Sequence, residues 1–391
     1  MNIFQSAKRY EEWLRRELGD DAVEEHLRAK HQKMAEGAFE FLRATYWRFA
    51  ETILKQCPEL KGAPRALAVG DIHLENFGTW RDADGRLVWG VNDFDEAAFM
   101  PYMLDVVRLA TSAALATSQG LSDAAICGAI AEGYAAGLKA PRPFVLDREH
   151  EWLRHTVIVR THEREKFWAK FDPARIEESK PERVDPVAPQ EIRRRYRKAI
   201  ERAHPHSVAN LKFFSREAGT GSLGRPRFFG TGEWHGDLVV REAKAILQSA
   251  WTLAHGGGRR LRCAEIATGR YRSSDPTYRV HRHVMVRRLS PNDFKIEVEK
   301  PKKKSPKKKD QKVKGRSSRE LISPRMLHAM GHDLASIHRA TCDKDALEID
   351  FEARRKSLHK IVTAVSKAIA GEQKQWKAHP SKWPRVGTGS K

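Results

Sequence analysis

The 391-residue sequence has only four cysteines, Cys57, Cys127, Cys263 and Cys342, and they are isolated from one another. This spacing predicts neither a disulfide framework nor a cysteine metal site, and free thiols are typical of a reducing compartment. No apolar run approaches the roughly 18 residues of a membrane span, and the first residues enter a charged helical pattern without the apolar core of a signal peptide. We therefore expect a cytoplasmic protein with no membrane segment.

Acidic residues are also scarce, with 51 Asp and Glu against 72 Lys and Arg, a net charge of +21. Residues 300–319 hold eleven of the basic side chains, one Asp and no aromatic residue. Their composition predicts a disordered basic loop, and the absence of aromatic rings argues against sequence-specific nucleic-acid recognition. The loop is either simply solvated or makes non-specific nucleic-acid contacts, and the overall charge favours an anionic partner.

The residues with the clearest chemical pattern follow two short apolar runs. The run 66–69 predicts a buried strand, after which a polar loop carries Asp71, His73 and Asn76. A turn signal at 82–85 precedes the second run, 87–91. We expect the two runs to form one hairpin-like unit.

The second run is followed by Asp93 and Asp95. Phosphoryl transfer needs a carboxylate that meets the incoming hydroxyl and oxygen ligands that hold Mg²⁺ on the nucleotide phosphates. Asp71 and Asn76 are five residues apart, as in the protein-kinase catalytic loop, and Asp93-Phe94-Asp95 stands where a D-F-G motif would follow.

These residues resemble the motif of aminoglycoside phosphotransferases and choline-kinase-like enzymes. More closely, they resemble a bacterial group known as domain of unknown function family 2252, in which G-D-A-H-x-x-N-F-G is followed by N-D-F-D-E. The similarity extends over about residues 30–345. It implies a kinase-like fold and no particular acceptor substrate.

The resemblance also implies a role for each residue of the motif. Asp71 would orient or deprotonate the acceptor hydroxyl, with His73 shaping the loop, while Mg²⁺ would be bound by Asn76, Asp93 and Asp95. On the apolar helix expected over 104–117, Asp105 would brace the catalytic loop by accepting its backbone N–H groups, unless it is an ordinary helix-start carboxylate. Arg108 lies on the same helix and belongs to the same supporting layer.

A glycine-rich turn appears 150 residues after this motif, with Gly219, Gly221, Ser222 and Gly224 between two β-type runs. Such a turn lets backbone N–H groups approach phosphates, although the pattern alone is weak evidence and a plain hairpin is the alternative. The following strand carries Arg241 and Lys244, and either could pair with ATP phosphates. The related group has lysine where this chain has Arg241, and the two side chains are not equivalent at a phosphate.

The expected fold class is α+β, a two-lobed protein-kinase-like fold with a helical lobe and a small antiparallel β unit. Because the glycine turn follows the catalytic motif, the fold would be circularly permuted. The expected units are a helical lobe with the catalytic hairpin (1–146), a helical cap or linker (147–205) with a polar Pro-containing break at 173–189, a β-rich nucleotide-covering lobe (206–299), the basic loop (300–320), and C-terminal helices with a loosely ordered tail from Gln373 (321–391). Helical patterns are expected over 6–56, 122–138 and 325–340, and the small residues of 122–138 should let that helix pack closely against its neighbours.

Several other features have weaker interpretations. The alternating run 278–289 predicts a strand beside the adenine, with Arg287 or Arg288 directed at the site or at solvent. His328 and His332 have the i, i+4 spacing of a zinc pair, but no glutamate lies between them, so a polar helix face is favoured. The segment beginning His235-Gly236-Asp237 imitates the catalytic motif but lacks its asparagine, and it predicts a hairpin turn. Arg43 could be a phosphate or carboxylate partner, although a solvated or structural arginine is favoured, and His338 has no assigned role.

The main functional hypothesis is an ATP- and Mg²⁺-dependent phosphotransferase acting on a hydroxyl of a small molecule or a protein. An alternative is a catalytically degenerate kinase-like module that binds nucleotide, or binds nucleic acid through its basic surface. Transfer of AMP in place of phosphate would use the same residues, and the sequence does not separate these reactions.

Overall fold

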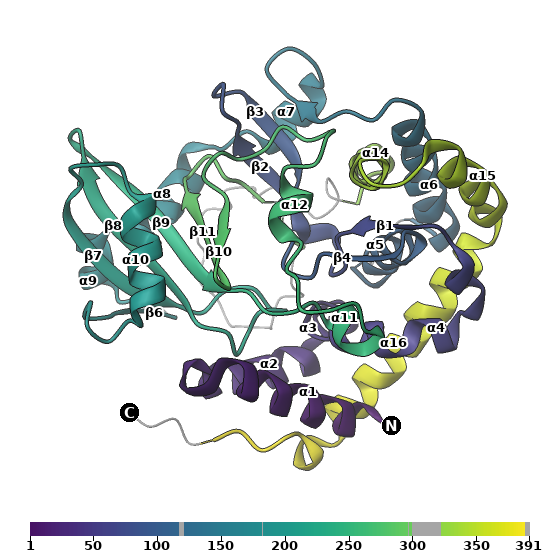
Figure 1. The fold of residues 1–391 in the computed structure, drawn as a ribbon, viewed down its shortest axis with the longest axis horizontal. Helices are drawn as coiled ribbons and strands as arrows, with labels where there is room; N and C mark the ends of the chain where they lie inside the picture. The colour runs from purple at the N-terminus through teal and green to yellow at the C-terminus, as the bar shows by residue number, and fades with distance from the viewer. Residues whose placement is uncertain (117–120, 182, 296, 299–321, 388–391) are drawn as a thin grey trace, which may run out of the picture.

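The computed structural model describes residues 1–116, 121–181, 183–295, 297–298 and 322–387 (Figure 1). Within these residues helices dominate, and every strand pairing is antiparallel. The architecture is therefore mixed α+β. The predicted basic loop at 300–320 lies outside the described residues. No helix in the described part of the chain combines the length and apolar character needed to cross a membrane.

Four helices form the N-terminal part of the protein: α1 (Ile3–Leu18), α2 (Glu24–Glu36), α3 (Ala38–Ala44) and α4 (Tyr46–Gln56). They follow the helical periodicity expected over residues 6–56. Helix α1 begins with a capping box in which the Asn2 side chain accepts from the Gln5 N–H, satisfying donors that helix starts leave unpaired. The four cysteines form no disulfide, as predicted.

The strands around the motif pair differently from the predicted hairpin. Strand β1 (Arg65–Ala68) pairs with β4 (Ala98–Pro101), whereas β3 (Leu87–Val91) pairs with β2 (Phe77–Arg81) and with the short β5 (Phe144–Val145). The prediction that 66–69 and 87–91 form one hairpin-like unit is therefore wrong. The strand at 77–81 is the preferred neighbour of β3 because the turn after it is short enough to close a hairpin directly.

A six-stranded antiparallel sheet occupies one side of the molecule, in the order β10-β11-β9-β8-β7-β6 (Figure 1). Its strands are β6 (Val184–Pro186), β7 (Ala209–Arg216), β8 (Arg227–Trp234), β9 (Asp237–Ala245), β10 (Arg279–His281) and β11 (Val284–Leu289). The turn between β8 and β9 has positive φ at His235 and Gly236, which confirms the predicted hairpin turn. The single strand expected over 278–289 is instead the β10–β11 hairpin.

The two faces of this sheet are covered by different helices. Helices α8 (Thr161–Phe171) and α9 (Pro173–Ser179) bury Phe171 and Ile176 against Phe214, Phe229 and Val240. Helix α10 (Arg194–Ala203) covers the other face, and Tyr196 packs on Phe228. The described part of the polar stretch at 173–189 therefore contains helix α9 and strand β6, which bury apolar side chains. Helix α7 (Glu151–Val157) precedes this unit.

The helical side of the molecule is built on α5 (Met103–Ala116), α6 (Asp123–Lys139) and α14 (Pro324–Arg339). Helices α6 and α14 approach closely at Gly133, Gly137 and Gly331, where an added Cβ would lie 1.9–2.4 Å from a backbone carbonyl oxygen of the partner helix. The close packing expected of the small-residue helix at 122–138 is thus confirmed. The short helices α11 (Ala250–His255) and α12 (Cys263–Ala267) connect the sheet to this side.

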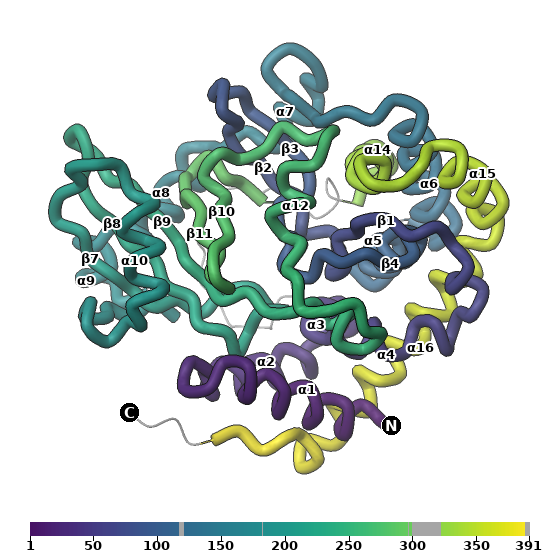
Figure 2. Tube along the Cα trace, in the orientation of Figure 1, coloured from purple at the N-terminus to yellow at the C-terminus, as the bar shows by residue number. Residues whose placement is uncertain are grey.

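The C-terminal segment is ordered further than the sequence indicates. After α15 (Lys344–Arg354), helix α16 (Leu358–Ala378) runs beside α1, α2 and α5, and Figure 2 traces it back toward the N-terminal helices. Trp376 is fully buried, stacks on Phe4 and Trp383, and donates its indole N–H to the His31 carbonyl. The prediction of a loose tail from Gln373 is wrong, because these aromatic contacts hold it.

Candidate functional site

One cavity of about 220 Å³ lies where the helical side meets the six-stranded sheet. Its walls include five of the predicted site residues with ionisable or amide side chains, together with part of the glycine turn: Asp71, His73, Asn76, Asp93, Asp95, Gly219, Gly221 and Ser222. Residues separated by about 150 positions in the chain therefore line one space. Three predicted site residues on the sheet side do not line it: Gly224, Arg241 and Lys244.

The loop that carries Asp71 is held from below by Asp105. The buried carboxylate of Asp105 accepts from the backbone N–H of Val69 at 2.6 Å and of Gly70 at 2.9 Å. His338 contacts the same carboxylate at 3.2 Å, and its other ring nitrogen lies 2.8 Å from the Tyr134 hydroxyl. The backbone hydrogen bonds expected of Asp105 are present, and they identify a supporting position for His338.

Asp71 and Arg108 form a direct ion pair beneath the cavity. Arg108 is fully buried, donates to the Leu42 carbonyl at 2.8 Å, and lies about 5 Å from the ring centres of Tyr46 and Phe49. Burial raises the pKa of Asp71 above its ordinary value, and the Arg108 charge opposes that rise. Arg108 thereby fixes one carboxylate oxygen and leaves the other on the cavity side.

His73 and Asn76 shape the loop between these elements. The Nδ1 of His73 accepts from the Glu75 N–H at 3.1 Å, and the Asn76 side-chain amide donates to the Asp71 carbonyl at 2.6 Å. Burial lowers the pKa of His73 well below its ordinary value, so the ring is neutral. Glu75 pairs with Arg43 at 2.8 Å. The arginine that the sequence analysis considered as a phosphate or carboxylate partner therefore has a carboxylate partner.

Asp93 and Asp95 follow β3, whose end is fixed by a buried carboxylate that the sequence did not single out. Asp333 accepts from the Val91 N–H at 2.8 Å. Lys244 then lies between the two motif carboxylates, 3.4 Å from Asp93 and 2.6 Å from Asp95. Asp93 remains 37% exposed, whereas Asp95 is 11% exposed, so Asp93 is the carboxylate that faces the cavity.

The charges around this pair act in opposite directions. Although burial opposes it, Lys244 and Lys295 hold the pKa of Asp93 well below its ordinary value. Burial, followed by the Asp93 charge, raises the pKa of Asp95. Asp93 is therefore the permanently ionised member of the pair.

Of the two basic residues expected on β9, Lys244 faces the motif and Arg241 does not. Successive strand residues point to opposite faces, so Arg241 lies on the side covered by α10, where its Nε donates to the Ala203 carbonyl at 2.8 Å. Lys244 lies three positions later, within β9. Lys244 therefore reaches the site as a regular residue of β9.

The glycine turn lies directly against Asp71. A Cβ on Gly221 would be 2.9 Å from an Asp71 carboxylate oxygen, so only glycine fits this approach without a shift. The Gly221 carbonyl accepts from the Lys30 ammonium at 3.1 Å. Gly224, with φ +97°, packs on Leu14 and Leu27, and its role is in the turn itself.

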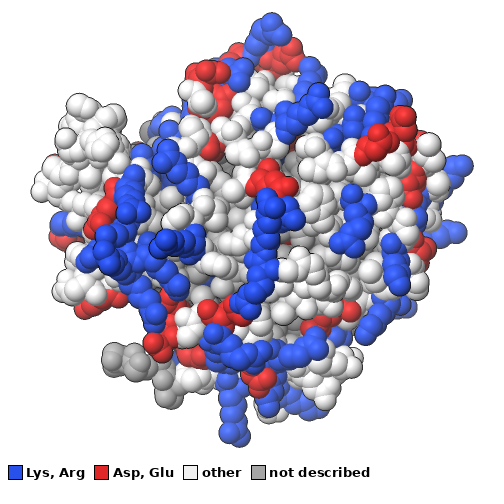
Figure 3. Space-filling model, viewed as in Figure 1, with Lys and Arg blue, Asp and Glu red and all other residues white. Residues whose placement is uncertain are grey.

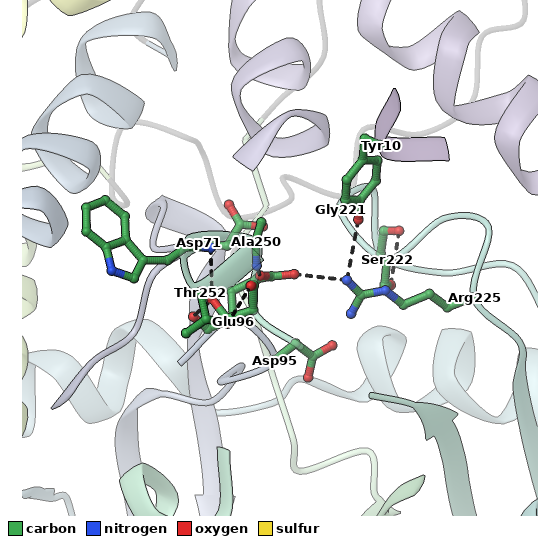
Figure 4. Close-up of polar contacts among 12 residues, drawn as sticks. Tyr10, Asp71, Asp95, Glu96, Gly221, Ser222, Arg225, Ala250 and Thr252 are labelled. Carbon is green, nitrogen blue, oxygen red and sulfur yellow. Dashed lines mark hydrogen bonds and ion pairs between the residues drawn. The ribbon is translucent and has the colours of Figure 1, made fainter. Parts of the chain in front are cut away.

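A buried ion pair connects this turn to the motif. Arg225 donates to the Glu96 carboxylate at 2.9 Å, and the other Glu96 oxygen accepts from the Ala250 N–H at 2.6 Å. Figure 4 shows this pair between Asp95 and the turn residues Gly221 and Ser222. The turn is therefore fixed to the segment that carries Asp93 and Asp95.

With this geometry established, the comparisons with known proteins can be stated. Residues 22–166 match the family described as an uncharacterized protein conserved in bacteria (DUF2252). The matched residues include the motif carboxylates and Arg108, but the match ends before the glycine turn and the six-stranded sheet. The comparisons with curated proteins and with solved structures found no match.

Beyond residues 22–166, the six-stranded sheet contributes arginine side chains to the site that the sequence analysis largely missed. The buried carboxylate of Glu242 is within 3.2 Å of Arg216, Arg227 and Arg287, so three positive charges surround one negative charge. Arg216, Arg227 and Arg287 also line the cavity, as does Lys295. Strand alternation on β9 would have predicted that Glu242 and Lys244 share one face. The three arginines could not be predicted in this way, because they come from three other segments.

A second cavity of about 270 Å³ adjoins the first, and the two share Arg216, Arg287, Lys295 and Glu297. Its walls include the aromatic residues Trp80, Phe94, Phe167, Phe171 and Tyr278. The Oδ1 atoms of Asn92 and Asp293 are buried there without a hydrogen-bond partner in the described residues. Buried polar atoms are rarely left unpaired, so this cavity is suited to a ring-containing polar ligand.

Asp293 gives the second cavity a pH dependence. Burial, followed by the Asp275 charge, raises the pKa of Asp293 from 3.8 to about 7. Between these values the folded protein binds a proton that the unfolded chain has released, so stability falls as the pH rises from about 4 to about 7. We expect the free energy of unfolding to fall less for Asp293→Asn than for the wild type as the pH rises over this interval. Urea unfolding at several pH values would measure this difference. Parallel curves for the two proteins would contradict this assignment.

Proposed function

We propose that the first cavity binds the phosphates of a nucleoside triphosphate with Mg²⁺ and transfers a phosphoryl group to a hydroxyl. The observation that carries this proposal is the meeting of the Gly219–Ser222 turn with Asp71, Asp93 and Asp95 around one cavity. Backbone N–H groups of a glycine turn suit phosphate oxygens, and the cations beside it suit their charge. The kinase-like fold and its circular permutation belong to this proposal.

The residues present fit a magnesium ion that also uses phosphate and water ligands. No group of three or more His, Cys, Asp or Glu side chains in the described ranges is arranged to hold a metal. Mg²⁺ usually takes only one or two carboxylates from the protein. Asp93, the unpartnered Oδ1 of Asp95 and the Asn76 amide oxygen would supply these ligands. The ion would neutralise charge on the transferred group.

The chain's own groups account for positioning. Arg108 holds Asp71 so that its free oxygen can orient an acceptor hydroxyl, and the raised pKa favours accepting its proton. Arg216, Arg287 and Lys295 lie between the two cavities, where a phosphate chain would pass. The aromatic second cavity would then hold the base, which agrees with the strand expected beside the adenine.

Nucleotide binding and turnover by the purified full chain test this proposal. We expect ATP with Mg²⁺ to raise the melting temperature more than ATP with EDTA, because the ion joins the phosphates to Asp93. Intact-mass measurement after incubation would distinguish attached phosphate from attached AMP. The absence of both a shift and nucleotide hydrolysis would reject the proposal and leave the degenerate-module alternative.

A further inference from the structure

A groove separate from both cavities lies on the opposite face of the six-stranded sheet. It has a volume of about 600 Å³ and runs between α10 and the β10–β11 hairpin. Its floor is formed by small apolar side chains, Ala199 on α10 and Val284 and Val286 on β11. We call this feature the α10 groove.

Cations line both banks of the α10 groove. Arg194, Lys198 and Arg202 follow one another at i, i+4 and i+8 on α10, and Arg279 and Arg282 stand on the hairpin opposite. Spacing of four residues places successive cations about 6 Å apart along the helix, so the row extends over about 12 Å. Figure 3 shows Lys and Arg side chains gathered over the place where Figure 1 draws α10.

These five cations have no acidic partners of their own. No carboxylate lines the groove, and none of the five side chains makes a hydrogen bond or ion pair with another described residue. Arg195 also lines the groove, but it pairs with Asp21, as Arg193 does. Folding therefore neutralises these two arginines and leaves the other five cations without an acidic partner among the described residues.

The chain offers no complementary segment to fill this groove. Its longest charged run, residues 300–319, has eleven basic residues and one acidic residue, so the groove would repel it. An external polyanion is favoured instead. Four of the five groove cations are arginines, whose planar guanidinium groups pair bidentately with phosphate.

We propose that the α10 groove binds the phosphodiester backbone of single-stranded nucleic acid without base selectivity. A single strand can lie between the two banks and cover the apolar floor, whereas a duplex would rest across the banks and leave the floor open. The groove has no Phe, Tyr or Trp ring among its lining residues on which bases could stack, and His281 is its one imidazole. Contacts are therefore to the backbone and strongly salt-dependent.

Fluorescence anisotropy with a labelled single strand and the full-length protein tests the proposal. The variant Arg194→Gln/Lys198→Gln/Arg202→Gln should weaken binding at least about tenfold at low salt and reduce the slope of log affinity against log salt by about two, since each single-strand phosphate contact contributes about 0.7. The matched control Lys360→Gln/Lys367→Gln/Lys374→Gln removes the same charge from exposed positions of α16. We expect it to bind nearly as the wild type does.

Three outcomes would overturn the assignment. If both triple variants weaken binding equally, the effect is one of net charge. If binding is lost only when Lys302, Lys303, Lys304, Lys307, Lys308 and Lys309 are changed to Gln, the contact belongs to the basic run. Equal competition by polyglutamate would indicate an acidic peptide partner and would also reject nucleic acid. Because the groove and the cavities lie on opposite faces of the sheet, the Arg194→Gln/Lys198→Gln/Arg202→Gln variant should keep the wild-type thermal response to ATP.

Discussion

Replacing Arg108 with methionine is expected to destabilise the protein by about 3–5 kcal/mol, because breaking a buried ion pair leaves an uncompensated charge. Arg108 is fully buried and pairs with Asp71 and the Leu42 carbonyl. The variant would leave Asp71 without its cation and would remove one of the two donors to the Leu42 carbonyl. Urea unfolding followed by tryptophan fluorescence would measure the loss.

A second variant separates the ion pair from simple packing. Asp71→Asn/Arg108→Met removes both charges, and we expect it to recover a substantial part of the lost stability, since replacing a buried pair by neutral groups is often tolerated. Arg355→Met is the surface control, because Arg355 pairs with the exposed Glu352 and such pairs contribute at most about 1 kcal/mol. Equal stability of the single and double variants would contradict a destabilising unpaired Asp71 charge.

Asp93→Ala is expected to abolish the stabilisation by ATP with Mg²⁺, which for a wild type at a ligand concentration of 100 times Kd would be about 2.7 kcal/mol. Asp93 is the more exposed motif carboxylate and stays ionised. The fold should tolerate the change, because Lys244 keeps Asp95 at 2.6 Å. Thermal unfolding with and without nucleotide measures the effect, and turnover should fall with it.

Asp84→Ala provides the control for this experiment. Asp84 lies in the turn between β2 and β3 and is 77% exposed, so its removal lowers the negative charge equally without touching the cavity. It should respond to ATP as the wild type does. An unchanged nucleotide response in Asp93→Ala would reject the metal assignment, even if another part of the chain binds ATP.

Local patterns in the sequence were sufficient for much of the fold. Apolar periodicity located α5, α6 and α14, and the Gly-containing turn at 235–237 was recognisable because positive φ is tolerated by few residue types. The strand at 87–91 was located correctly, but its partner was not, because strand pairing depends on contacts distant in the chain. The order of the tail beyond Gln373 depends in the same way on Phe4 and Trp383.

In the candidate site, too, local patterns identified some residues and others required the tertiary structure. The motif spacing identified Asp71, Asn76 and Asp93, since those residues are close in the chain and share one chemistry. The choice of Lys244 over Arg241 required the register of β9, because strand alternation sends neighbouring side chains to opposite faces. Arg216, Arg287 and Lys295 come from separate segments, and no local pattern connects them.

The sequence by itself determined the helical segments, the charge excess and the residue types suited to phosphate and Mg²⁺ chemistry. Only the tertiary structure decided that the glycine turn reaches Asp71, that three arginines surround Glu242, and that Arg194, Lys198 and Arg202 on α10 have no acidic partner in the described part of the chain. The physical reason is that residue type and periodicity are local properties, whereas cavities and ion pairs arise where distant segments pack together.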